Sequence, residues 1–140
     1  MFSLKKVLAG AFGAGLVIAI VSLPASPAMA AVSTCHPATQ SFPQPCISTT
    51  GTGLYIGTLS GWGNNTTLIS YQHVHIELYG PNGLIKNCPQ FNLSPGYSTP
   101  VCSWSPNHNE PAGTYGQTIW LQTGTNSYRS LSSITVGVHS

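Results

Sequence analysis

Four cysteines follow an N-terminal segment with the features of an export signal, and this combination limits the possible folds more than any other feature of the chain. Residues 1–30 begin with a charged stretch, continue with an apolar run over residues 7–23 and end in Ala-Met-Ala, a small-residue pattern that signal peptidases cut. We therefore expect residues 1–30 to be a signal peptide and the mature protein to begin at Ala31. In the oxidising compartment beyond the membrane, cysteines form disulfides rather than metal sites or nucleophiles.

The apolar run is not expected to remain as a membrane anchor. Its length, about seventeen residues, lies near the lower limit for crossing a bilayer. Pro24 and Pro27 follow the run directly, and no cluster of charged residues follows it, which favours cleavage. We expect a secreted protein with no membrane attachment after signal removal.

The disulfide pairing is open to three alternatives, because four cysteines can pair in three ways. We predict the sequential pairing, Cys35 with Cys46 and Cys88 with Cys102, since each pair encloses a Pro-rich or turn-rich segment. A domain of about 110 residues gains from covalent closure, and each bond is expected to contribute roughly 2–4 kcal/mol.

Charge is scarce in this chain. Charged residues make up 4% of it, against about 25% in typical soluble domains. Removal of the signal lysines leaves Lys86 and Arg129 against Glu77 and Glu110, so the net charge of the mature chain is zero. No basic patch remains to neutralise phosphates, and nucleic acid is therefore not an expected partner. A surface of Ser, Thr, Asn and Gln suits a polysaccharide, cell-wall or protein partner, and it equally serves to keep a secreted β-domain in solution.

The period of the apolar pattern in the mature chain is two, which predicts strands and no helix. Residues 31–52 are rich in Pro, Ser and Thr and are expected to form an irregular leading segment before a β-sandwich domain over residues 53–140. Strands are predicted over residues 53–60, 66–79, 84–93, 101–105, 114–123 and 128–138. The Gly-Trp-Gly-Asn-Asn stretch at residues 61–65 is predicted to be a loop. Six or seven short strands with turns between them favour an all-β, antiparallel sandwich.

One motif resembles a known family. Residues 110–115, Glu-Pro-Ala-Gly-Thr-Tyr, open an alternating strand and resemble the corner between the E and F strands of immunoglobulin-like sandwiches, as found in secreted bacterial Ig-like domains. The resemblance covers the C-terminal half of the chain and implies an Ig-like fold in which the Tyr115 hydroxyl bonds back to upstream backbone. Gln117 stands where an antibody domain has its second inter-sheet cysteine, so that disulfide is absent. The resemblance implies no activity.

Catalysis is not expected. The chain contains no aspartate, and its two carboxylates are Glu77 and Glu110. A Ser-His-Asp triad is therefore impossible, and a glycosidase would have to use this one pair as acid and base. The cysteines are expected to be consumed in disulfides, which removes Cys-His chemistry.

A histidine pair suggests an alternative function. On a strand, His73, His75 and Glu77 would point to one side, with successive side chains roughly 6.5–7 Å apart, so that two imidazoles could share a copper or zinc ion. A third protein ligand would have to come from elsewhere, with His36, His108 and His139 as candidates. The other interpretation is that His73, His75 and Glu77 form the solvated face of a half-buried strand, which requires no cofactor.

Aromatic residues suggest a binding surface. Trp62, between two glycines in the predicted loop, is the candidate for an exposed indole that stacks on a sugar or anchors a protein partner. Trp104 and Trp120 are expected in the core.

The segment between Cys88 and Cys102 allows a further alternative, a braced loop presented to a protease, or a toxin role. The sequence as a whole favours a secreted, non-catalytic binding or interaction module at or outside the cell envelope.

Overall fold

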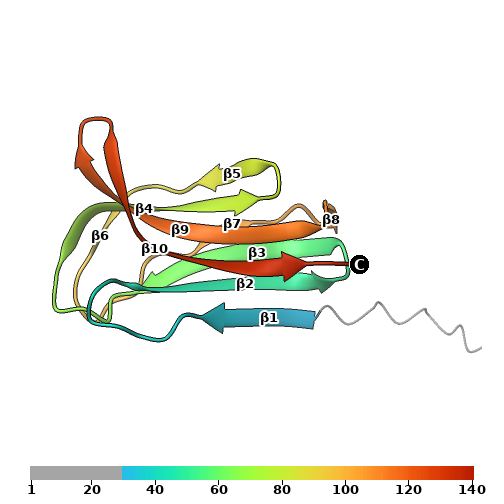
Figure 1. The fold of residues 1–140 in the computed structure, drawn as a ribbon, viewed down its shortest axis with the longest axis horizontal. Coiled ribbons are helices and arrows are strands. Elements are labelled where there is room, and N and C mark those ends of the chain that lie inside the picture. Colours follow the sequence, from blue (N-terminus) through green and yellow to red (C-terminus); the bar gives the residue numbers. More distant parts are fainter. Residues whose placement is uncertain (1–29) are drawn as a thin grey trace, which may run out of the picture.

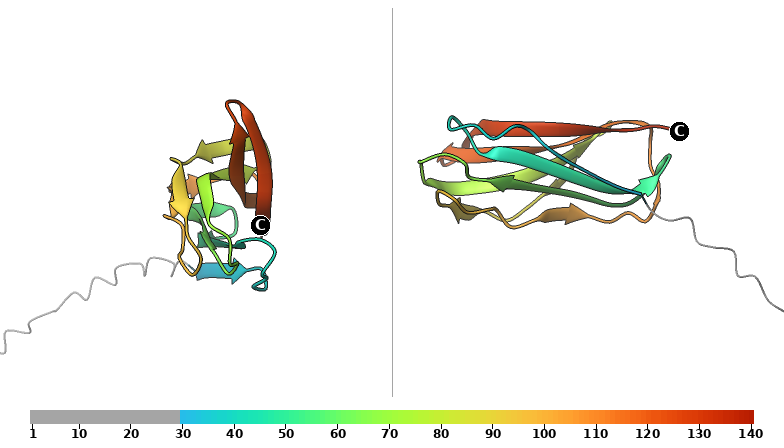
Figure 2. Two further views of the ribbon diagram at one scale, coloured as in Figure 1. Left: turned by 90° about the vertical axis from the view of Figure 1, so that its left-hand side faces the viewer. Right: turned by 90° about the horizontal axis from the view of Figure 1, so that it is seen from below.

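The computed structural model describes residues 30–140, which form ten strands in two antiparallel sheets (Figure 1). Sheet A has the strand order β1-β2-β3-β7, with β8 paired to β3, and sheet B has the order β10-β9-β4-β5, with β6 paired to β4. The strands are β1 (Ala30–Cys35), β2 (Gln44–Thr52), β3 (Tyr55–Asn64), β4 (Tyr71–Gly80), β5 (Gly83–Asn87), β6 (Phe91–Leu93), β7 (Cys102–Trp104), β8 (His108–Asn109), β9 (Gly113–Gly124) and β10 (Ser127–Val138). The predicted all-β sandwich is confirmed, and Figure 2 shows its layers from the end and from below.

The predicted signal peptide lies outside the described residues, except for Ala30. Within residues 30–140, no helix is present that has the length and apolar character needed to span a bilayer.

The leading segment differs from the expectation. Residues 31–52 were expected to be irregular, but they supply β1 and β2, and β2 lies inside sheet A between β1 and β3. Pro43 and Pro45, which suggested irregularity, are buried, and Pro45 pairs with Gly63 near the start of β2. Proline is tolerated at the beginning of a strand, where the ladder loses little from its missing N–H.

The sequential disulfide pairing is confirmed. Cys35–Cys46 joins directly opposed residues of β1 and β2. Cys88–Cys102 connects the segment after β5 in sheet B to β7 in sheet A, and Cys102 is 1% exposed. Two disulfides are consistent with an oxidising, extracellular environment.

The predicted loop over residues 61–65 is wrong for most of its length, because β3 continues through Asn64. Gly61 and Gly63 face the opposite sheet at very short range. A Cβ at Gly61 would lie 2.8 Å from the Gln117 Cβ, and one at Gly63 would lie 2.4 Å from the Ile119 Cδ1. These glycines therefore mark a close approach between the sheets, which is a known use of glycine inside strands.

The core between the sheets is formed by alternate residues of the central strands. Val74, Ile76 and Leu78 of β4 are fully buried, as the alternation predicted. They pack with the other buried side chains of the core, among them Ile47, Ile56, Leu59, Leu93, Tyr115 and Ile119. Gln117 lies among them at 1% exposure, and its Nε2 donates to the Trp62 carbonyl at 3.1 Å and to the Cys46 carbonyl at 3.3 Å. One side-chain amide of sheet B thus bridges two strands of sheet A.

The corner at residues 110–115 has the hydrogen bond that the resemblance implied. The hydroxyl of Tyr115 donates to the carbonyl of Pro111 at 2.8 Å, and the ring is 1% exposed. Burial, followed by the charge of Glu110, raises the pKa of Tyr115. The bond fixes the start of β9 against the loop that precedes it.

Several strand boundaries differ from the predicted ones. Residues 66–70 form a turn before β4, in which Asn65 Oδ1 accepts from the backbone N–H of Thr67 at 3.1 Å and from its hydroxyl at 2.7 Å. The predicted strand over residues 84–93 is divided into β5 and β6 by the segment that carries Cys88. The short β8 lies in what was predicted as loop.

Removal of the inter-sheet disulfide Cys88–Cys102 is expected to lower the free energy of unfolding more than removal of Cys35–Cys46. The two bonds enclose similar separations, 11 and 14 residues, so loop entropy alone predicts nearly equal effects. Cys88–Cys102 also holds the two sheets together, whereas β1 is an edge strand. In urea titrations, the Cys88→Ala, Cys102→Ala protein should lose about 3–5 kcal/mol of unfolding free energy. The Cys35→Ala, Cys46→Ala protein should lose less, and equal losses would contradict this account.

Gly61→Ala tests the close approach of the sheets. The added methyl group would meet the Gln117 Cβ, which cannot move without its backbone, so we expect a loss of about 1–3 kcal/mol in thermal or urea unfolding. Gly124→Ala is the control, because its nearest atom is 3.6 Å away. The prediction fails if both variants unfold like the wild type.

Candidate functional site

The structure separates the three residues of the predicted metal site. A register shift between Tyr71 and Val74 interrupts the alternation of β4, and His73 has a φ of +54° within it. His75 and Glu77 remain neighbours on the outer face of sheet B, with 3.4 Å between Nε2 and Oε1, but His73 is exposed and does not join them. The expectation that all three share one regular face is wrong at His73, because the bulge rotates the chain there.

Within the described residues 30–140, no three His, Cys, Asp or Glu side chains converge in a way that could hold a metal ion. His108, one of the candidates for a third ligand, lies instead 3.1 Å from Glu110.

His75 and Glu77 belong to a network of hydrogen-bonded side chains that covers the outer face of sheet B. The Tyr79 hydroxyl donates to Glu77 Oε2, and the indole N–H of Trp120 donates to the Tyr79 hydroxyl at 3.1 Å. The ring of Tyr128 stands edge-on to the imidazole of His75, with 5.2 Å between ring centroids. His75 is 4% exposed, and its Nδ1 has no hydrogen-bond partner within the described residues. Trp120, expected in the core, therefore lies on the outer face.

The network raises the pKa of Tyr79 to about 12. Burial is the main cause and the hydrogen bond to Glu77 adds to it, while the hydrogen bond from Trp120 acts in the opposite direction. Glu77 is thus hydrogen-bonded to its neighbours His75 and Tyr79 on the strand.

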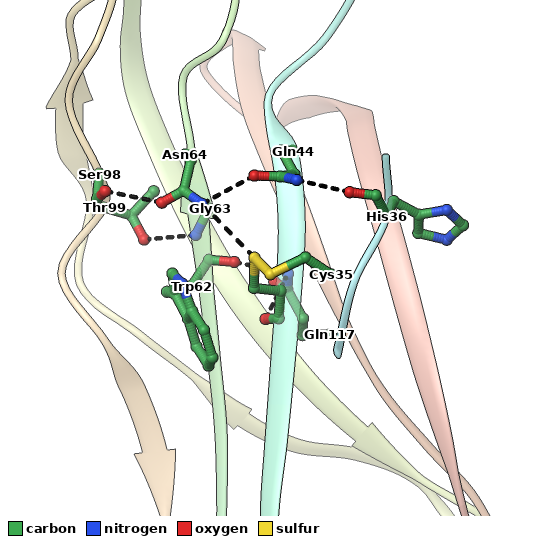
Figure 3. Close-up of a disulfide and its surroundings, with 10 residues drawn as sticks. Cys35, His36, Gln44, Trp62, Gly63, Asn64, Ser98, Thr99 and Gln117 are labelled. Atoms are coloured by element: carbon green, nitrogen blue, oxygen red, sulfur yellow. Dashed lines mark hydrogen bonds between the residues drawn. A yellow bond between two sulfur atoms is a disulfide. The ribbon is translucent and has the colours of Figure 1, made fainter. Parts of the chain in front are cut away.

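Trp62, the predicted exposed indole, is half-buried on β3 (Figure 3). It lies directly opposite Cys46 in the ladder, next to the Cys35–Cys46 disulfide. The amide of Asn64 donates to Gln44 Oε1 at 2.9 Å. The hydroxyl of Ser98 donates to Asn64 Oδ1 at 2.7 Å, whereas the buried Gln117 Oε1 has no hydrogen-bond partner within the described residues.

The braced segment between Cys88 and Cys102 is attached to both sheets. β6, inside this segment, pairs with β4, and Thr99 bonds to Gly63 through its backbone N–H at 2.8 Å and its hydroxyl at 3.0 Å. Tyr97, 70% exposed, lies at its outer turn. This geometry does not favour a loop presented to a protease.

A groove with a volume of about 680 Å³ lies at the end of the sandwich where β4 begins. It is lined by residues 41–42, 69–73, 121–122 and 129–131. These come from the β1–β2 loop, the start of β4 and the two strands of the β9–β10 hairpin, whose turn extends beyond the other strands at the upper left of Figure 1. His73 lines the groove, so the bulge that removes His73 from the predicted metal site places it here.

The groove combines apolar and unpaired polar side chains. Phe42 and Ile69 are 39% and 55% exposed, and Leu121 and Leu131 lie at the margin of the core. Tyr71 is 7% exposed, and its hydroxyl has no hydrogen-bond partner within residues 30–140. The same is true of the side chains of the other polar lining residues except Gln122, namely Ser41, Ser70, Gln72, His73, Arg129 and Ser130.

These free groups contrast with the turn beside them. There, Asn65 uses both of its side-chain atoms, and Thr67 donates its hydroxyl. Polar side chains that line a concave site without internal partners can bind a ligand without first breaking a bond within the protein. The left-handed conformation of His73 fits this assignment, since strained residues gather at functional sites.

A second depression adjoins the groove and shares His73 and Gln122 with it. It continues along residues 122–125 toward the β9–β10 turn. The combined surface is therefore longer than the groove alone, which suits an extended ligand.

The sequence predicted His73 as a metal ligand and not as a groove residue. It did not single out Phe42, Tyr71 or Arg129 for a binding site. Arg129 is one of two lysine or arginine residues in the described residues 30–140, and this scarcity was the signal that could have drawn attention to it. Comparison with protein-family models, curated proteins and solved structures finds no match to this chain.

Tyr79 should make the stability of the protein fall at high pH. Its pKa in the folded state, about 12, exceeds the ordinary value of 10.0, so the folded state holds the proton more tightly. Its contribution is fully present below pH 10 and is lost as the pH rises from 10 to 12. The unfolding free energies of wild type and Tyr79→Phe, measured over this range, should therefore converge. Parallel curves would contradict the raised pKa.

Proposed function

We propose that this protein is a secreted, non-catalytic binding module that holds a polysaccharide or cell-wall glycan in the groove at the end of the sandwich. The observation that carries the proposal is the set of unpaired polar side chains around exposed and partly buried apolar ones in one concave site. Sugars present hydroxyl groups that donate and accept hydrogen bonds, together with a C–H face that packs on an aromatic ring. Tyr71, Gln72 and Phe42 offer both kinds of contact.

Secretion is supported by the export-type segment at residues 1–30 and by the two disulfides. The absence of catalysis is supported by the positions of the two carboxylates. Glu77 is engaged by Tyr79 and His75, Glu110 lies beside His108, and neither lines the groove. The groove therefore has binding groups but no carboxylic acid to act as a general acid or base.

The size of the groove suits this role. Its volume falls within the range of small-molecule sites, about 300–1,000 Å³, and the adjoining depression extends it. A glycan chain could thus occupy several positions along the same surface.

Phe42→Ala tests the proposal. In affinity electrophoresis of the processed protein against a panel of neutral and acidic polysaccharides, we expect retention by at least one, weakened about tenfold or more by this variant through loss of an aromatic contact. Phe42 lies in a loop and is 39% exposed, so the fold should be retained.

Two further variants locate the site. Tyr97→Ala removes an aromatic ring that is 70% exposed and lies outside the groove, and it should bind like the wild type. Trp62→Ala tests the alternative site on sheet A, where the sequence predicted an exposed indole that contacts a ligand. Binding that survives Phe42→Ala and is lost in Trp62→Ala would move the site to that face, and no retention by any polysaccharide would refute the proposal.

A further inference from the structure

We infer that the groove recognises an acidic sugar, a uronate unit within a polysaccharide, and that Arg129 binds its carboxylate. This inference rests on the proposed function and names the ligand class of the same site. It depends on the distribution of the few charged groups in the described part of the chain.

Three of the four charged side chains in residues 30–140 have partners. Glu77 accepts from Tyr79, Glu110 lies 3.1 Å from His108, and the ammonium group of Lys86 donates to the Ser103 carbonyl at 2.6 Å. Arg129 alone makes no ion pair and no side-chain hydrogen bond within the described residues, and it lines the groove.

The position of Arg129 on the hairpin turns its side chain toward the groove. Arg129 lies opposite Leu121 in the β9–β10 ladder, and directly opposed residues of a ladder have their side chains on the same face. Leu121 packs against the core. The Arg129 side chain therefore lies on the same, core-facing side of sheet B, beyond the last core residues. Tyr128, the preceding residue, lies on the opposite face against His75.

The surroundings of Arg129 favour a bound carboxylate. No carboxylate of the protein lines the groove to compete for the guanidinium group. The planar guanidinium group of Arg129, which is exposed to solvent, can bind a carboxylate through two parallel hydrogen bonds. Because the groove contains one arginine, it is suited to bind a ligand group with a single negative charge rather than a densely charged phosphate polymer.

The remaining side chains favour a sugar over an acidic peptide. Ser41, Ser70 and Gln72 supply unpaired hydroxyl and amide groups, which complement the hydroxyls of a sugar ring. Phe42 supplies an aromatic surface for its C–H face. The adjoining depression past His73 offers room for the next units of a chain.

The test measures binding of oligogalacturonate and oligoglucuronate by isothermal titration calorimetry, each compared with its methyl ester, which keeps the sugar and removes the charge. Wild type should bind an acid form about 10- to 100-fold more tightly than its ester, a difference that shrinks with added salt. Arg129→Gln should remove most of that difference. Arg129→Lys should restore only part of it, because lysine retains the charge without the planar fork.

Lys86→Gln is the matched control. It changes the net charge of the chain by the same amount as Arg129→Gln, but Lys86 lies outside the groove. If both variants weaken binding equally, the effect is one of net charge and the inference is overturned.

The remaining outcomes separate the inference from the proposed function. Equal binding of acid and ester forms, both weakened by Phe42→Ala, would overturn the acidic-sugar inference and leave the glycan groove in place. A polyglutamate peptide that binds as tightly as the uronates, in an Arg129-dependent manner, would overturn the sugar and identify a peptide site. Failure of both uronates would overturn the inference, and the neutral polysaccharides of the wider panel would then decide the proposed function.

Discussion

The close contact between β3 and β9 is the constraint on which the rest of the structure depends. Gly61 and Gly63 leave no side chain between the sheets at this point, so Gln117 and Ile119 pack directly on the backbone of β3. Gln117 uses the contact to donate to carbonyls of two strands of sheet A, and thereby links the two sheets. Hydrogen bonds have preferred angles as well as lengths. The two bonds from the buried Gln117 amide therefore restrict both the separation and the relative orientation of the sheets.

The scarcity of charge determines how this protein satisfies its polar groups. With four charged side chains in the described residues, it relies on neutral hydrogen bonds between strands, such as that between the hydroxyls of Ser60 and Ser103 at 2.9 Å. Neutral groups cost less to bury than charges, provided that each finds a partner. Within the described residues, the buried polar side-chain atoms without a partner are His75 Nδ1, Gln117 Oε1 and Ser132 Oγ. The unpaired polar side chains of the groove, Tyr71 excepted, are exposed to solvent.

Much of the fold could be predicted from the sequence, because alternation and cysteine spacing are local signals. Val74, Ile76 and Leu78 alternate cleanly and are buried, and the sequential disulfides form. Glycine was the main source of error, since Gly61 and Gly63 have the same local signature whether they end a strand or let another sheet approach. Residues 31–52 were misjudged for a related reason, because a proline at a strand start and one inside a loop look alike.

The groove could not be predicted from the sequence, because it depends on two irregularities of sheet B. The bulge near His73 in β4 turns that residue away from His75, and the register shift between Ser130 and Ser132 in β10 changes the course of the hairpin beside Arg129. A bulge exists only relative to a partner strand, so neither irregularity has a signature in the chain itself. His73 and Arg129, which are far apart in the sequence, both line this groove. Because the net charge of residues 30–140 is zero, such a site would gain little from long-range attraction, and its selectivity would depend on contact geometry.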